Sequence, residues 1–132
     1  MINWRLPEFG RFLSVGVLNT FVGLLTIYSA KWFFQAGDVA ANILGYAVGI
    51  CISFKLNGYW TFRYRGAQWP ALSKFLAVTA VAYGMNLLTL VFSIHYLGLN
   101  EYLSQALAIL PYALTSYLAG KYLVFAVKAK TN

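Results

Sequence analysis

The sequence predicts an all-α membrane protein with four transmembrane helices, and its composition and charge spacing lead to this fold class. Of the 132 residues, 61% are hydrophobic and only 10% are charged, whereas soluble domains are about 45–50% apolar and about 25% charged. The ionisable residues leave four stretches without formal charge, at 12–30, 39–54, 75–100 and 102–120. A bilayer-spanning helix needs about 20 mostly apolar residues. Each stretch therefore accommodates one span, with snorkelling side chains at its ends.

The first predicted span covers about residues 11–34. Its uncharged run, Phe12 to Ala30, has 19 residues, which is longer than the core of a signal peptide, and no convincing small-x-small cleavage site precedes Lys31. We therefore expect this helix to be retained.

The remaining spans are separated by turn-forming residues. They are predicted at about residues 39–60, 73–96 and 102–125, with turns at Gln35–Asp38 and Gly98–Glu101 and a polar link at Thr61–Leu72 that contains Gly66 and Pro70. Four helices and their connections occupy all of this sequence, so we expect a single transmembrane domain over residues 1–132.

An internal repeat relates the two halves at an offset of 63 residues. Residues 11–65 and 74–128 share 10 identities in 55 ungapped pairs, where this composition gives about 4 by chance. Each half contains two spans, so both halves enter the membrane from the same side. The sequence thus predicts two parallel two-helix repeats, one at about 11–65 and one at about 74–128.

The basic residues predict the topology. Nine of them fall on one side of the predicted membrane and Lys31 alone on the other; the nine are Arg5, Arg11, Lys55, Arg63, Arg65, Lys74, Lys121, Lys128 and Lys130. Positively charged loops remain in the cytoplasm. Both termini and the middle link are therefore predicted to be cytoplasmic, and the net charge of +7 is expected to attract anionic headgroups, not nucleic acid.

Mostly small residues repeat at i+4 spacing on the second and fourth predicted helices. They are Ala41, Gly45, Gly49, Ser53 and Asn57 on the second, and Ser104, Ala108, Tyr112, Ser116 and Gly120 on the fourth. Such a face lets two helix backbones pack closely. The alternative is a groove for part of a lipid chain, which a kink at Pro111 would keep open.

Several cations gather near the predicted cytoplasmic ends. Lys55 lies about one turn inside the second helix, where its ammonium either snorkels to the headgroups or binds an anion. Lys121 lies near the matching position of the second repeat. Together with Arg11, Lys74, Arg63 and the amide of Asn57, these groups form a candidate phosphate site, because charged donors make strong hydrogen bonds to phosphate.

The other polar residues argue against proton-coupled transport, metal binding and catalysis. The acids Glu8, Asp38 and Glu101 are not in mid-span positions, which argues against a proton-coupled antiporter. Asp38 and Glu101 either cap helix N-termini and complement the helix dipole or bind sugar hydroxyls at the outer mouth. With one cysteine, Cys51, and one histidine, His95, we expect no disulfide, metal site or catalytic residue. A phosphate-binding loop is also missing, so we expect no enzyme activity and no cofactor.

Two motifs resemble the GtrA-like family of small four-span bacterial membrane proteins. They are Arg11-Phe-Leu-Ser-Val-Gly-Val-Leu-Asn19-Thr20 and Ser53-Phe-Lys-Leu-Asn57-Gly-Tyr-Trp60-Thr-Phe-Arg63. The resemblance extends over about residues 11–128 and implies functional roles for Asn19, Asn57, Trp60 and Arg63. The sequence departs from the family pattern at Gly58, and at Gly120, Lys121 and Leu123 in the second half.

The resemblance implies that the protein moves a polyprenyl-phosphate-linked monosaccharide, such as undecaprenyl-phosphate glucose, across the bacterial cytoplasmic membrane for cell-surface polysaccharide synthesis or modification. The expected partners are this lipid-linked sugar, membrane lipids, membrane glycosyltransferases and a second copy of the chain. The alternative is a scaffold or regulator that anchors a glycosyltransferase and transports nothing.

Overall fold

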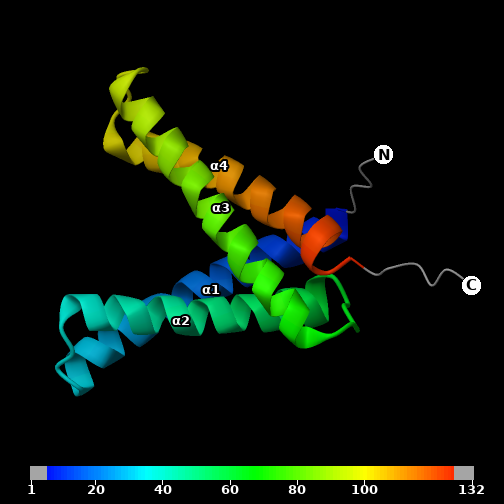
Figure 1. The fold of residues 1–132 in the computed structure, drawn as a ribbon. Helices are drawn as coiled ribbons and strands as arrows, with labels where there is room; N and C mark the ends of the chain where they lie inside the picture. The colour runs from blue at the N-terminus through cyan, green and yellow to red at the C-terminus, as the bar shows by residue number, and fades with distance from the viewer. Residues whose placement is uncertain (1–5, 127–132) are drawn as a thin grey trace, which may run out of the picture. The chain divides into compact units, whose positions relative to one another are not determined.

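A computed structural model of the protein describes residues 6–126, and within this range the chain forms only helices, turns and short connections. Four α-helices follow one another along the chain (Figure 1). The second and the fourth are each followed directly by a single π-helical turn. Their bounds are α1 Leu6–Phe33, α2 Asp38–Leu56, η1 Asn57–Thr61, α3 Gln68–His95, α4 Glu101–Ala119 and η2 Gly120–Val124. Four helical segments are long and apolar enough to cross a membrane. The predicted all-α, four-span fold class is confirmed.

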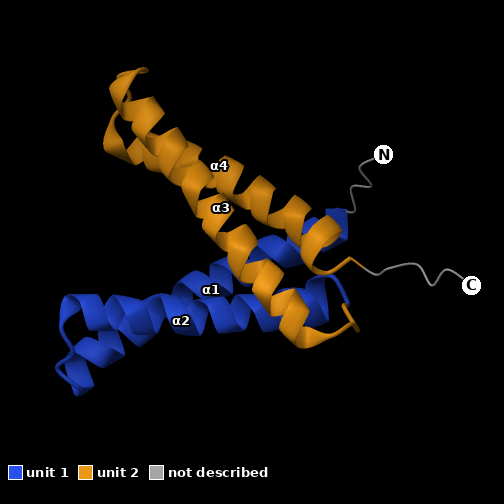
Figure 2. Cartoon of the chain, in the orientation of Figure 1, with its two compact units in different colours: residues 1–63 blue, residues 64–132 orange. Residues whose placement is uncertain are grey.

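The chain divides into two compact units, residues 1–63 and 64–132 (Figure 2). Each unit is a helical hairpin, in which α2 packs on α1 and α4 packs on α3. The elements have the same lengths in both hairpins, 28, 19 and 5 residues. Asp38 and Glu101, which begin α2 and α4, are 63 residues apart, as are Asn57 and Gly120, which begin the π-helical turns.

The predicted bounds of α1 and α3 were wrong at their N-terminal ends. The described helices begin at Leu6 and Gln68, not near residues 11 and 73. Pro70, predicted in the link, lies in the first turn of α3. Proline fits there because the first-turn N–H groups have no intrahelical acceptor to lose. The basic residues Arg5, Lys128 and Lys130 lie outside the described residues.

The small face of α2 packs against α1. Ala41, Gly45 and Gly49 are buried. A Cβ atom placed on Gly45 would lie 3.1 Å from the carbonyl oxygen of Gly23, and one placed on Gly49 would lie 2.9 Å from Asn19 Oδ1. Only glycine permits this approach of the two helices.

The small face of α4 packs against α3 in the same way. Ser104 and Ala108 are fully buried, and Asn86 Nδ2 donates a 3.0 Å hydrogen bond to the carbonyl oxygen of Ala108. In both hairpins the small faces thus serve helix packing. They do not form the lipid groove that was the alternative, and α4 continues through Pro111 to Ala119.

Candidate functional site

The basic end of the first hairpin consists of Arg11, Lys55 and Arg63, next to the π-helical turn η1. Arg11 projects from α1, and its Cζ atom lies 5.9 Å from the centroid of the Trp60 ring on η1. A guanidinium at this distance from an indole makes a cation–π contact. Lys55 and Arg63 are exposed. Three cations therefore gather at the end of one membrane-spanning hairpin.

The Asn57 side chain is buried at the basic end of the first hairpin and is not on the surface of the protein. Its side chain is 3% exposed, Nδ2 donates a 3.1 Å hydrogen bond to Ser53 Oγ, and Oδ1 accepts a 3.0 Å bond from Thr61 Oγ1. Both ends of the amide are thus occupied by neighbours on the same helix. Asn57 was predicted to bind the phosphate, whereas its amide bonds Ser53 and Thr61. The i+4 spacing of these three polar residues is the sequence signal that indicates the two bonds.

Arg63 adopts a left-handed backbone conformation, with φ of 52°. It follows Phe62, whose N–H donates a 2.8 Å hydrogen bond to Asn57 O and closes the π-helical turn. A left-handed residue at a helix C-terminus is usually glycine, because a Cβ atom is strained there. The chain therefore holds a long basic side chain at a position that would favour glycine.

Asn19 lies near the middle of α1, beside Gly49. Its Oδ1 atom is buried and has no hydrogen-bond partner among residues 6–126. This amide lies within the seam between α1 and α2, away from the cations at the basic end. A role for Asn19 in substrate binding stays a prediction.

The second hairpin holds its cation differently. Lys121 is half-buried, with Nζ 5.8 Å from the ring centroid of Tyr117 and 5.6 Å from that of Tyr122. Lys74 is exposed, and next along α3 Phe75 contacts Phe125, with ring centroids 6.2 Å apart. Lys74 and Lys121 belong to the second unit, and a phosphate site shared with the first unit stays a prediction.

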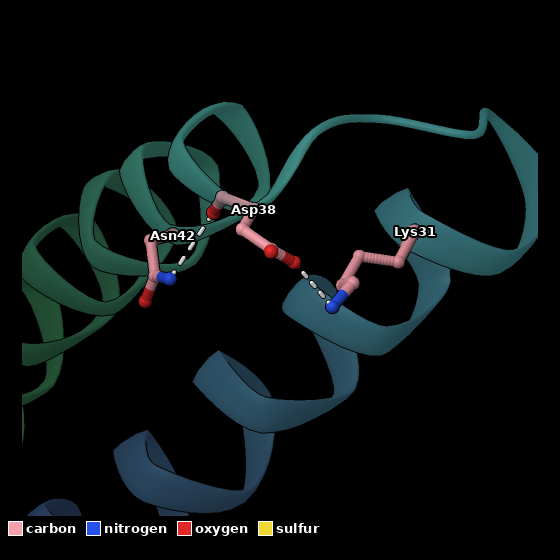
Figure 3. A network of polar contacts seen from close by, with 3 residues as sticks. All are labelled: Lys31, Asp38 and Asn42. Carbon is pink, nitrogen blue, oxygen red and sulfur yellow. Dashed lines mark hydrogen bonds and ion pairs between the residues drawn. The ribbon is translucent and has the colours of Figure 1, made fainter.

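The opposite end of the first hairpin carries an ion pair. Lys31 Nζ at the end of α1 lies 2.5 Å from Asp38 Oδ1 at the start of α2, and Asn42 Nδ2 donates a 3.1 Å bond to the backbone oxygen of Asp38 (Figure 3). A shallow groove of about 590 Å³ runs along α2 from Asp38 to Ile50 and also includes Tyr46.

Asp38 and Glu101 complement the dipoles of their helices as predicted, but the prediction that they occupy the cap positions was wrong. Each acid is the first helical residue and lies in the favourable field of the helix N-terminus. The N-cap residue of α2 is Gly37, which has no side chain to cap the helix. The N-cap residue of α4 is Asn100, whose Oδ1 accepts a 2.8 Å hydrogen bond from the N–H of Leu103. Glu101 itself is exposed.

The sequence model of the GtrA/DPMS transmembrane domain matches residues 11–125. The chain belongs to this family. No curated protein and no solved structure matches the chain. The GtrA/DPMS domain begins at Arg11, the cation stacked on Trp60, and ends at Phe125, directly after η2. It covers both hairpins, which confirms the resemblance drawn from the two motifs and identifies a multi-pass membrane protein.

The GtrA/DPMS domain brings only some of the predicted site residues together. Arg11 and Trp60 are in contact, while Lys55 and Arg63 flank η1 without a hydrogen-bond or ion-pair partner among residues 6–126. Within residues 6–126 no group of three His, Cys, Asp or Glu side chains is placed to hold a metal ion. The arrangement offers positive charge and hydrogen-bond donors at one end of the hairpin, which suits an anionic group at a membrane surface.

Proposed function

We propose that this GtrA/DPMS protein carries a polyprenyl-phosphate-linked monosaccharide across the bacterial cytoplasmic membrane for cell-surface polysaccharide synthesis or modification. The observation that supports it most is the basic end of the first hairpin, where the Arg11 guanidinium stacks on Trp60 close to the exposed cations Lys55 and Arg63. A lipid phosphate lies at the depth where such side chains reach the headgroups.

The chemistry of the basic end fits a phosphate. The Arg11 guanidinium lies over the Trp60 ring, and a guanidinium can donate two parallel hydrogen bonds to phosphate oxygens. Lys55 contributes a point charge on a flexible stem. We place this end on the cytoplasmic side, where the lipid-linked sugar is loaded, because the positive-inside bias of the sequence favours it.

The sugar is proposed to reach the other end of the hairpin. There the Asp38 carboxylate and the Asn42 amide border the groove along α2, and Tyr46 adds an aromatic ring. A carboxylate accepts hydrogen bonds from sugar hydroxyls, and an amide both donates hydrogen bonds to them and accepts hydrogen bonds from them. Glu101 supplies a second exposed carboxylate in the second hairpin.

We propose facilitated transport and not an enzymatic reaction. The described acids Glu8, Asp38 and Glu101 lie in the first turns of their helices, so none is placed as a mid-span proton carrier. A carrier without a coupling device only speeds equilibration, and the direction then follows consumption of the sugar on the outer side.

Purified protein in liposomes tests the proposal. Movement of undecaprenyl-phosphate glucose between leaflets should need neither ATP nor a proton gradient and should fall in Lys55→Ala and Arg63→Ala. Arg65→Ala, which removes an exposed cation of the link between α2 and α3 that is given no role in binding, is the matched control. Uphill accumulation driven by a pH difference at zero potential would contradict facilitated transport.

Failure of the purified protein to move any lipid would favour the scaffold function, in which the chain anchors a glycosyltransferase. Co-purification of such an enzyme with the intact protein, unaffected by Lys55→Ala, would then be the expected result.

A further inference from the structure

We propose that Trp60 is a positioning residue, which acts on the lipid phosphate only by holding the Arg11 guanidinium in place. The proposal rests on the proposed function, because it assigns how one residue of that site works. It differs from the family resemblance, which implies only that Trp60 has a functional role.

The contact between Arg11 and Trp60 joins two helices that are distant in sequence. Arg11 is half-buried on α1 and Trp60 is 44% exposed on η1. Among residues 6–126, no hydrogen bond or ion pair involves the Arg11 side chain, so the ring at 5.9 Å is what fixes it. An unrestrained arginine would lose rotamer freedom when it binds a phosphate, and a preformed stack removes part of that loss.

The π-helical turn fixes the position of the Trp60 ring. A turn of this kind is wider than an α-helical turn and changes the direction of the side chains that follow. The hydrogen bond from Asn57 to Ser53 (3.1 Å) ties it to α2, the bond from Thr61 to Asn57 (3.0 Å) lies within it, and Thr61 is 2% exposed. Trp60 therefore projects from a turn that is held on its buried side.

The second hairpin supplies a natural comparison. Its turn η2 closes with the same bond, from the N–H of Phe125 to Gly120 O at 2.8 Å, but Leu123 stands where the first hairpin has Trp60. Lys74, at the position that matches Arg11, is exposed. The two hairpins thus share the turn, and only the first adds the two side chains, Arg11 and Trp60, that make the contact.

A double-mutant cycle on the full-length protein in detergent tests the proposal, with undecaprenyl phosphate as the probe and undecaprenol as the lipid without phosphate. Trp60→Leu should weaken phosphate-dependent binding roughly three- to tenfold, and Trp60→Tyr should retain most of it. In an Arg11→Ala background, Trp60→Leu should have no further effect. Trp69→Leu, which removes a tryptophan that is 80% exposed in the second hairpin, is the matched control.

Fluorescence supplies a readout that does not depend on the lipid. With Trp4, Trp32 and Trp69 replaced by phenylalanine, Trp60 is the remaining tryptophan of the four, and its emission should shift in Arg11→Ala but not in Lys55→Ala. An unchanged emission in Arg11→Ala would overturn the positioning role.

Equal weakening by Trp60→Leu with and without Arg11 would also overturn it, because Trp60 would then contact the lipid itself. Binding that does not distinguish undecaprenyl phosphate from undecaprenol would overturn the proposed function as well as the role assigned here.

Discussion

The two hairpins contain the same elements at the same spacing, but a different polar group lies at each helix crossing. In the first, Gly45 approaches the backbone of Gly23, and the amide of Asn19 lies one turn away with an unpaired oxygen. In the second, Asn86 stands at the position of Gly23 and hydrogen-bonds the carbonyl oxygen of Ala108, the counterpart of Gly45. The repeat therefore preserves helix length and the crossing point while the contact itself has changed.

This difference shows that helix length and helix crossing depend on separate physical requirements. Helix length is set by the thickness of the bilayer, which both halves share. A crossing needs only that large and small groups complement each other and that buried polar atoms find partners. Asn19 and Gly49 in the first hairpin correspond to Ala82 and Tyr112 in the second, so the large and the small residue have exchanged helices.

The largest effect should come from breaking this complementarity with Gly49→Tyr, which introduces the residue of the second hairpin into the first. A Cβ atom there already lies 2.9 Å from Asn19 Oδ1, so we expect destabilisation by about 3 kcal/mol. Adding Asn19→Ala should restore part of the loss. Unfolding in mixed detergent and SDS, followed by circular dichroism, measures both.

Gly16→Ala is the control for that substitution, because no atom lies within 4 Å of a Cβ atom at this position. A Gly49→Tyr protein as stable as the wild type would show that the seam of the first hairpin is not tightly packed.

A smaller loss should follow Asn86→Leu, which removes the hydrogen bond to Ala108. Interhelical hydrogen bonds of this kind are worth about 0.6–1.7 kcal/mol in membrane proteins. Asn19→Leu should cost less than Asn86→Leu, because the Asn19 oxygen has no partner to lose. The same unfolding measurement compares the stability losses of the two variants. A larger loss for Asn19→Leu than for Asn86→Leu would contradict the stabilising role of the Asn86 hydrogen bond.

Arg63→Gly should change stability in the opposite direction. Glycine relieves the left-handed backbone at φ 52°, so we expect a gain of up to about 1 kcal/mol, together with weaker binding of undecaprenyl phosphate. Ala126, at the matching position of the second hairpin, is not left-handed, and Ala126→Gly should give no gain. Equal stabilisation by Arg63→Gly and Ala126→Gly would show that the gain does not come from the left-handed backbone of Arg63.

The smallest effect should come from Asp38→Asn, which breaks the ion pair with Lys31. Both side chains are exposed, so solvent screens the pair and high salt should abolish any difference from the wild type. Glu101→Gln in the second hairpin also removes a first-turn acid, and because Glu101 has no ion pair among residues 6–126 its fall in melting temperature at low salt should be smaller than that of Asp38→Asn. A large, salt-independent loss for Asp38→Asn would mean that the pair is buried in the assembled protein.

Sequence reasoning located the four spans, the turns and the offset between the halves, because each depends on residues that are neighbours along the chain. It placed Lys55 and Arg63 beside the end of α2 for the same reason. It did not find the hydrogen bonds of Asn57 inside η1, because the amide of an asparagine serves a ligand or a neighbour equally well. Nor did it find Lys31 as the partner of Asp38, which depends on the geometry of the turn between them.

The sequence by itself determined that this chain consists of four membrane-spanning helices with most of its positive charge near one set of ends, since uncharged runs and basic clusters are local properties. Only the tertiary structure decided which faces meet: that Gly45 packs on Gly23, that Asn86 bonds Ala108 and that Arg11 stacks on Trp60. The physical reason is that these helices are apolar on all sides, facing lipid and neighbour alike. Periodicity therefore cannot fix their rotation, and close packing of small residues and pairing of the few buried polar atoms must do so.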